Sequence, residues 1–234
     1  MIARVLVVLI GVLTTHAAAS ESISGDRLLA DVRAKYAALE TYSDAGILVV
    51  ESKPIGATTI REQLTFVTRF QTPKRFYFDA KKQTGERFVI WCPDDTFHSW
   101  WSATQVHEAY SRGEGANAFA MGALPTFGSA LLIPPLLFQA AGLPGALMTM
   151  QQPRYLGVEM LDNRRMHKLI GSVRENHWND SVRETTLWVD AETLLVHKIF
   201  EDTPSGMGAA IQRTTTTLKP RLPPRFEADA FVFR

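Results

Sequence analysis

Histidine side chains are the first candidates for chemistry in this chain, because imidazole is a common metal ligand. Of the six histidines, five lie downstream of residue 19, and no two of these have the His-x-His or helical His-x-x-x-His spacing that chelates a metal ion. A site could still assemble from different strands, but the spacing does not indicate one, and we predict no metal site. The five are His98, His107, His167, His177 and His197.

Cys92 is the sole cysteine and the candidate nucleophile. A thiol beside Pro93 in an apolar strand is better explained as a buried core residue, and Asp94 and Asp95 are better explained as turn formers. The chain has no Gly-x-Ser-x-Gly elbow, and the Gly-Glu-Gly at residues 113–115 lacks the third glycine of a phosphate-binding loop. We therefore predict no catalytic residues and no cofactor, and a protein that is not an enzyme.

Apolar binding is the other chemistry that these side chains could support. Trp91, Trp100 and Trp101 lie in adjacent predicted strands, and two interpretations stay open: the wall of a ligand cavity, or ordinary β-core. Neighbouring residues of a strand face opposite sides, so one of Trp100 and Trp101 is a candidate for the concave face. The residues that we expect to line an apolar cavity are Phe66, Phe70, Phe76, Phe78, Trp91, Trp101, Leu132, Leu137 and Phe138.

The elements that must position these side chains are one helix and many short strands. Ser24 is a good N-cap, and apolar residues recur at three- and four-residue intervals from Leu28 to Leu39, which predicts a helix over residues 24–39. Pro, Gly and Asp turns then separate short β-like segments, as in an antiparallel meander. We expect strands near residues 46–51, 64–70, 74–80, 87–91, 96–101, 105–110, 154–161, 166–174, 182–189, 194–201 and 209–218.

A segment of different character interrupts the strands at residues 116–147. No acidic or basic residue occurs from Ala116 through Gln152, and four prolines lie between positions 125 and 144. Proline removes a backbone donor and clashes inside a helix, so we expect short helices and loops rather than a membrane span. These helices would form a lid inserted over one face of the sheet.

Residues 1–19 have the composition of a secretory signal peptide. Arg4 supplies a basic start, residues 5–13 are an apolar run, and small residues end at Ala19. The uncharged stretch from Val5 to Ala19 is shorter than the roughly 20 residues that span a bilayer. We expect cleavage near Ala19, a periplasmic location, and a single domain over residues 20–234.

The expected mature chain carries no net side-chain charge. Removing Arg4 leaves 24 of the 25 basic residues against 24 acidic ones. Nucleic-acid-binding proteins usually have a clear basic excess, so we predict no nucleic-acid partner. A single cysteine allows no intramolecular disulfide, and we expect a monomer.

Four motifs, in their order and spacing, carry a family resemblance over most of residues 24–234. The first is Tyr36-Ala-Ala-Leu39 with Tyr42-Ser43 after it, and the second is Phe70-Gln-Thr-Pro73-Lys-Arg-Phe76, a strand-to-strand turn. The third is the hairpin at residues 88–97, and the fourth is the turn in Leu187-Trp-Val-Asp190-Ala-Glu-Thr193. Together they resemble the periplasmic lipoprotein-localisation factors, the LolA/LolB-like superfamily.

This resemblance implies an α+β, mainly β fold: a curved antiparallel sheet, or half-open barrel, with an N-terminal helix and a helical lid over an apolar concave face. It implies a periplasmic carrier that binds a lipid or an acylated lipoprotein. The alternatives are an envelope regulatory or interaction module of this fold and, less favoured, a cofactor-free enzyme. Thr72 replaces the family's arginine before the turn proline, so the lid contact of that arginine is not carried over. Arg69, Lys74 and Arg75 form a basic rim that would suit an envelope protein.

Overall fold

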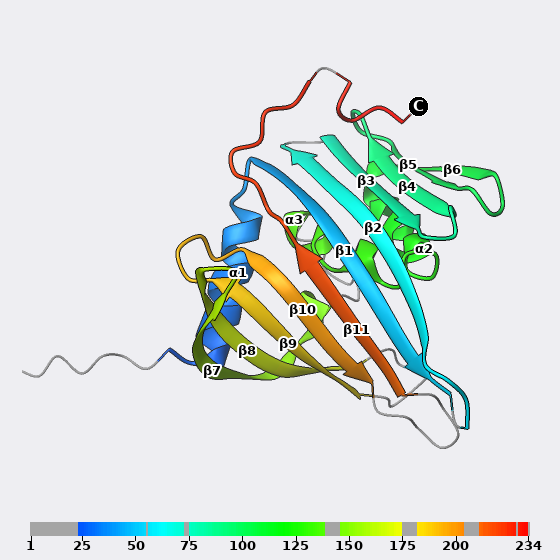
Figure 1. Cartoon of the computed structure of the whole chain (residues 1–234). Helices are drawn as coiled ribbons and strands as arrows, with labels where there is room; N and C mark the ends of the chain where they lie inside the picture. Colours follow the sequence, from blue (N-terminus) through cyan, green and yellow to red (C-terminus); the bar gives the residue numbers. More distant parts are fainter. Residues whose placement is uncertain are drawn as a thin grey trace, which may run out of the picture.

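The computed structural model describes residues 23–54, 56–72, 75–138, 146–174, 182–203, 211–227 and 229–233. Within them, eleven strands form one sheet in the order β6-β5-β4-β3-β2-β1-β11-β10-β9-β8-β7, with β6 and β7 at its open edges (Figure 1). Two antiparallel meanders, β1–β6 and β7–β11, join where β1 pairs with β11. The signal peptide predicted at residues 1–19 lies outside the described residues.

Most strands are longer than average for globular proteins, and every described helix except α1 is shorter than average. The strands are β1 (Thr41–Lys53), β2 (Ile60–Gln71), β3 (Arg75–Lys82), β4 (Arg87–Cys92), β5 (Phe97–Trp101), β6 (Val106–Tyr110), β7 (Gln151–Leu161), β8 (Arg164–Arg174), β9 (Val182–Asp190), β10 (Val196–Thr203) and β11 (Ile211–Leu218). The helices are α1 (Gly25–Ala37), η1 (Arg112–Glu114), α2 (Gly115–Gly122), η2 (Ser129–Leu131), α3 (Pro134–Phe138) and α4 (Ala146–Thr149).

Helix α1 begins where its sequence predicts. The Ser24 side chain accepts a hydrogen bond from the Arg27 N–H at 3.2 Å, which caps the helix. Asp26 in the first turn and Lys35 in the last complement the helix dipole. The apolar face that α1 buries consists of Leu28, Leu29, Val32 and Tyr36.

The sheet has two faces of different composition, because successive residues of a strand point to opposite sides. Along β1, Leu48 and Val50 are buried on the concave face, whereas Ile47 on the convex face is exposed. The main core lies on the concave side. A second, smaller apolar cluster lies on the convex side of β3 and β4, around Tyr77 and Val89.

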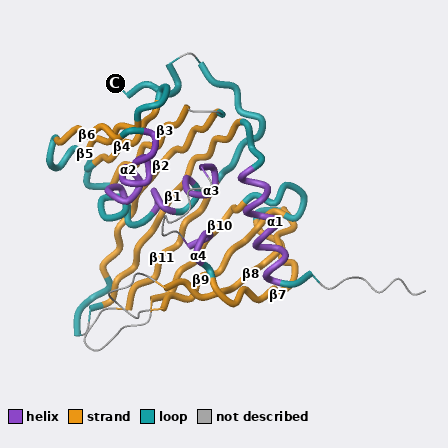
Figure 2. The backbone as a smooth tube through the Cα atoms, turned by 180° about the vertical axis from the view of Figure 1, so that it is seen from behind, coloured by secondary structure: helices purple, strands orange, loops and turns teal. Residues whose placement is uncertain are grey.

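The short helices lie on the concave face, as the view from behind shows (Figure 2). Two glycines let α2 approach the sheet closely. A Cβ at Gly115 would come within 2.8 Å of the Phe97 ring, and one at Gly122 within 2.8 Å of the Phe88 ring. The segment predicted as a lid thus contains short helices against the sheet.

The fold class expected from the sequence is confirmed: an open, curved, antiparallel sheet with an N-terminal helix and short helices over its concave face. Among the residues described, no helix is both long enough and apolar enough to cross a bilayer.

Candidate functional site

The candidate site is an aromatic cluster between the concave face and the short helices. At its centre is the ring of Phe138, at the end of α3. Its centroid lies 5.3 Å from that of Phe70, 5.2 Å from Phe76, 5.4 Å from Phe97 and 5.6 Å from Phe119. The first three contacts have ring planes at 70–84°, close to the edge-to-face geometry that aromatic quadrupoles favour.

Strand alternation positions the sheet side of this cluster. Phe66 and Phe70 lie on the concave face of β2, Phe76 and Phe78 on that of β3, and all four are buried. The Phe66 and Phe78 rings are 5.7 Å apart. Gly46 of β1 lies directly against Phe66, since a Cβ there would be 2.1 Å from the ring. Any side chain at position 46 would therefore displace this ring.

The short helices supply the other side of the site. Leu132 and Leu137 are buried in the same core, and Phe138 packs against it half-buried. Trp101 of β5 also packs on this core, and its indole N–H donates to a Glu86 carboxylate oxygen at 2.7 Å. The structure thus brings together all the predicted cavity residues except one.

The exception, Trp91, is a correction to the sequence analysis, because it lies on the convex face. It pairs with Tyr77 across β3 and β4, and its ring stacks on that of His98 at 5.1 Å. Its neighbours Ile90 and Cys92 point into the concave core. Alternation along the strand then forces Trp91 to the other side.

The predicted basic rim is also on the convex side. The guanidinium of Arg75 lies 4.5 Å from the centre of the Phe231 ring, and Arg69 donates to the carbonyl oxygen of Ala230. Both arginines therefore contact the last segment of the described chain. Lys74 lies outside the described residues. That this rim binds an envelope protein stays a prediction.

Arg33 of α1 is a contact residue of the lid that sequence analysis missed. Its Nε donates to the Leu147 carbonyl at 2.8 Å, and its Nη2 to the Met148 carbonyl at 3.0 Å. Partial burial lowers the pKa of Arg33. Its position directly after buried Val32, at the border of the apolar helix face, is the only sequence signal that could have indicated this role.

A buried polar group connects α1 to the sheet beside the site. The Tyr42 hydroxyl donates to the Asp44 carboxylate at 2.7 Å, and the Thr68 N–H donates to the same carboxylate at 3.1 Å. The Val196 N–H donates to the Tyr36 hydroxyl at 3.1 Å. Burial raises the pKa of Asp44 to about 6, although the hydrogen bonds from Tyr42 and Thr68 oppose the shift. Nothing in the sequence around Tyr42, Asp44 and Thr68 indicated that these polar side chains would meet on a buried face.

The site is suited to apolar contact. Cys92, the candidate nucleophile, is buried in β4, as expected for a core residue, and its thiol donates to the carbonyl oxygen of Asp94 at 3.5 Å. His98 and His107 come together, with ring nitrogens 3.2 Å apart, but on the convex face. Within the described ranges, no group of three or more His, Cys, Asp and Glu side chains could hold a metal ion.

The solved structures that are similar to this chain share low sequence identity with it. It is similar to the lipoprotein LppX of Mycobacterium tuberculosis, with 13% identity and a TM-score of 0.44 over 87% of this chain and 100% of that one. It is also similar to MucB of Pseudomonas aeruginosa in complex with MucA, with 12% identity and a TM-score of 0.42 over 86% of this chain and 58% of that one.

A LolA superfamily protein of Nitrosomonas europaea is similar at 8% identity and a TM-score of 0.33, over 91% of this chain and 99% of that one. No protein-family model matches the chain, and no curated protein matches it. In its open antiparallel sheet, its N-terminal helix and the short helices over its concave face, the chain has the architecture that its resemblance to the LolA/LolB-like superfamily implies.

Proposed function

We propose that the protein binds the apolar part of a lipid, or the acyl group of a lipoprotein, between the concave face and the short helices, and carries it in the periplasm. The observation that supports this best is the position of Phe138. Its ring packs among four other phenyl rings, and it ends a helix of five residues. A small displacement of α3 would exchange this ring for an acyl chain.

The energetics of the short helices favour such an exchange. The α2, α3 and α4 helices have eight, five and four residues, and isolated helices shorter than about 12 residues are marginal in water. Contacts with the sheet and α1 therefore hold them in place. An acyl chain can replace these contacts, because each buried methylene contributes about 0.8 kcal/mol and each buried Phe or Leu side chain about 1.5–3 kcal/mol.

The composition of the lid defines which part of the ligand enters. No residue from Ala116 to Gln152 is charged, and an unpaired charge is costly to bury. The inserted part is therefore uncharged and apolar, and a polar headgroup stays at the mouth of the site.

Two measurements test this proposal. Native mass spectrometry of the protein purified from its periplasm should reveal a co-purified lipid. Binding of an environment-sensitive apolar dye, or of a long-chain fatty acid, should raise the melting temperature by mass action. Leu132→Glu or Phe138→Glu should weaken dye binding by more than tenfold, whereas Val182→Glu, at an exposed position, should leave it unchanged.

The proposal fails if neither lipid nor dye binds the folded wild-type protein. It also fails if the Leu132 and Phe138 variants, folded by circular dichroism, bind the dye as well as the Val182 variant does. Either result would leave the aromatic cluster as core packing alone.

A further inference from the structure

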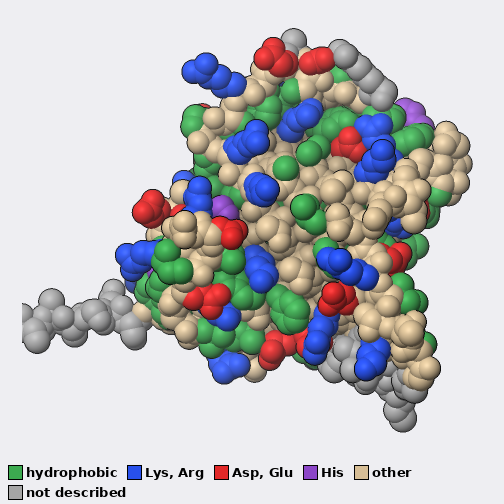
Figure 3. All heavy atoms as spheres, viewed as in Figure 1, with side chains coloured by type: hydrophobic (Ala, Val, Ile, Leu, Met, Phe, Trp, Pro, Cys, Tyr) green, Lys and Arg blue, Asp and Glu red, His purple; other side chains and the backbone are tan. Residues whose placement is uncertain are grey.

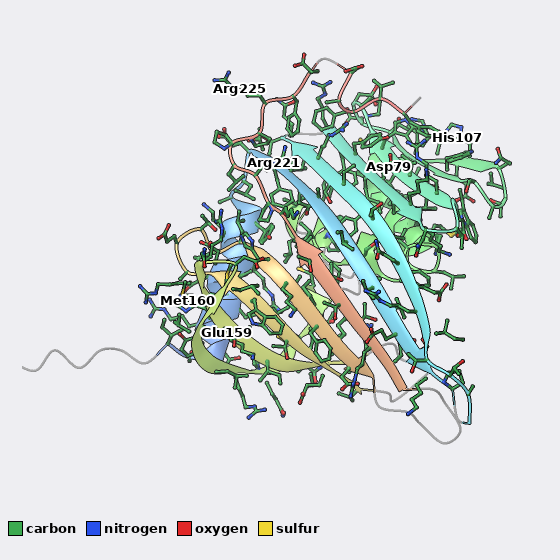
Figure 4. All side chains as sticks on the ribbon, in the orientation of Figure 1. Asp79, His107, Glu159, Met160, Arg221 and Arg225 are labelled. Atoms are coloured by element: carbon green, nitrogen blue, oxygen red, sulfur yellow. The ribbon has the colours of Figure 1, made fainter. Side chains whose placement is uncertain are left out.

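Part of the convex face of β2–β5, around Tyr77 and Trp91, is covered by the last segment of the described chain, residues 219–227 and 229–233, called here the tail segment. Figure 1 shows it leaving β11, passing one end of the sheet and returning over β3–β5. Arg221 and Arg225 mark its course in Figure 4. It packs on an aromatic surface, called here the platform, that consists of Val67, Tyr77, Val89, Trp91 and Trp100.

Aromatic anchors attach the tail segment to the platform. Phe231 is fully buried, and the Phe233 ring lies 4.8 Å from Trp91 and 5.2 Å from Trp100. Between these two anchors, Val232 is 48% exposed. The chain makes two successive turns here, in which the N–H groups of Ala230 and Val232 donate to the carbonyls of residues 227 and 229, and both rings pack on the platform.

Three arginines of the sheet complete the contact. Arg69 donates from Nη1 to the Ala230 carbonyl oxygen at 2.7 Å. The guanidinium of Arg75 lies 4.5 Å from the centre of the Phe231 ring, and that of Arg87 lies 5.2 Å from the centre of the Phe233 ring. Arginine binds aromatic faces and peptide carbonyls together, so these side chains suit a peptide better than a lipid.

The tail segment is attached in the manner of a peptide ligand, not as a strand. Its backbone joins the sheet at Lys219 and Arg221, whose N–H groups donate to the carbonyls of Ala45 and Ser43. Farther along the described tail, the backbone-to-backbone hydrogen bonds are internal, from Ala230 and Val232 to residues 227 and 229. The tail beyond Arg221 can therefore leave without breaking a strand pair.

We infer that the platform is a peptide-binding site that the tail segment occupies in cis. The structure points to one class of partner: a protein segment that turns as the tail does, with two aromatic residues at alternate positions and acidic residues before them. The tail itself has this pattern, with Glu227 and Asp229 ahead of Phe231 and Phe233. The basic side chains on this face, seen among exposed apolar ones in Figure 3, complement such a segment.

This inference does not depend on the ligand of the concave face. A partner segment can bind the platform only by displacing the tail. Because the tail belongs to the same chain, its effective concentration at the platform is high. The partner therefore binds weakly until the tail is released.

The test uses a fluorescently labelled peptide of residues 222–234 and the full chain. A variant with Phe226, Phe231 and Phe233 changed to Ser leaves the platform unoccupied, and it should bind the peptide at least tenfold more tightly than the wild type does. A peptide with Ser at positions 231 and 233 should bind this variant at least tenfold more weakly, since two buried rings are lost.

The single variant Phe233→Ser is a second route if the triple variant does not fold. Its affinity for the labelled peptide should lie above that of the wild type, and Arg69→Ala in the same background should reduce it. Equal affinity of the peptide for the wild type and for every folded variant, or no effect of the Ser-substituted peptide, would overturn the inference.

Discussion

Asp44 carries a carboxyl group whose ionisation is opposed by its burial. Burial raises its pKa from an ordinary value of 3.8 to about 6. A carboxyl whose pKa is higher in the folded state stabilises the fold most below about pH 4, and this stability is lost as the pH rises through 6. Relative to Asp44→Asn, the wild type should lose on the order of 2 kcal/mol of unfolding free energy between pH 4 and pH 7. Urea titrations of both proteins measure this, and parallel pH profiles would contradict it.

Phe138 is the residue that fills the candidate site. Phe138→Ala should lower the unfolding free energy by about 3 kcal/mol and leave an apolar cavity. Such cavities stay dry and bind small apolar molecules, so benzene or the apolar dye should raise the melting temperature of this variant more than that of the wild type. Met121→Ala, at a half-exposed position of α2, is the matched control. A destabilised Phe138 variant that no apolar ligand restores would argue against the site.

Side-chain direction was predictable at some residues and not at others. Alternation required Trp100 and Trp101 to face opposite sides, and Trp101 does pack on the concave core while Trp100 packs on the convex cluster. The side of the sheet that Trp91 faces could not be predicted from alternation in the same way. Val89 and Ile90 are both fully buried, so β4 is covered on both faces and lacks the polar alternation that identifies the solvent side.

At the scale of elements, local signals located the first helix better than the first strand. The helix predicted at residues 24–39 is α1, and Ser24 caps it as predicted. The strand predicted at residues 46–51 runs from Thr41 to Lys53. Asp44 resembles a loop residue in sequence, because its carboxylate needs partners. Its partners come from Tyr42 and Thr68, and the second belongs to a strand that only the fold brings near.

In the lid, too, local sequence signals predicted the elements but not the contacts between them. Prolines and the absence of charge predicted short helices, but the contact between Arg33 and α4 joins residues 114 and 115 positions apart. No local pattern specifies a pair at that separation. The aromatic cluster likewise depends on where α3 packs, which the sequence of α3 alone does not encode.

Arg33 should control how readily α4 leaves the sheet. Arg33→Met keeps most of the aliphatic length of the side chain and removes both donors to the carbonyls of Leu147 and Met148. Amide hydrogen exchange in residues 146–150 should become faster, and the apolar dye should associate more rapidly, with the fold retained. Arg27→Met, at an exposed position of the same helix, should change neither. Unchanged exchange in the Arg33 variant would mean that other contacts hold α4.

At the scale of the whole molecule, one sheet separates two apolar clusters. The lid packs on the concave face and the tail segment on the convex face, and β3 contributes to both through alternate residues, such as Phe76 on one side and Tyr77 on the other. The two faces can therefore bind different partners without sharing a surface, provided that binding on one face does not shift β3 and β4.

Independence of the two faces has a measurable consequence. The aromatic partners of Phe138 are the concave rings of Phe70, Phe76, Phe97 and Phe119, whereas those of Phe233 are Trp91 and Trp100. Because the two sets share no residue, the losses of unfolding free energy in Phe138→Ala and Phe233→Ser should add within about 0.5 kcal/mol in the double variant. Urea unfolding of the four proteins measures this, together with dye binding, which Phe233→Ser should leave unchanged. An interaction energy above about 1 kcal/mol would mean instead that β3 and β4 shift when either face is altered, and that release of the tail segment changes the affinity of the concave site.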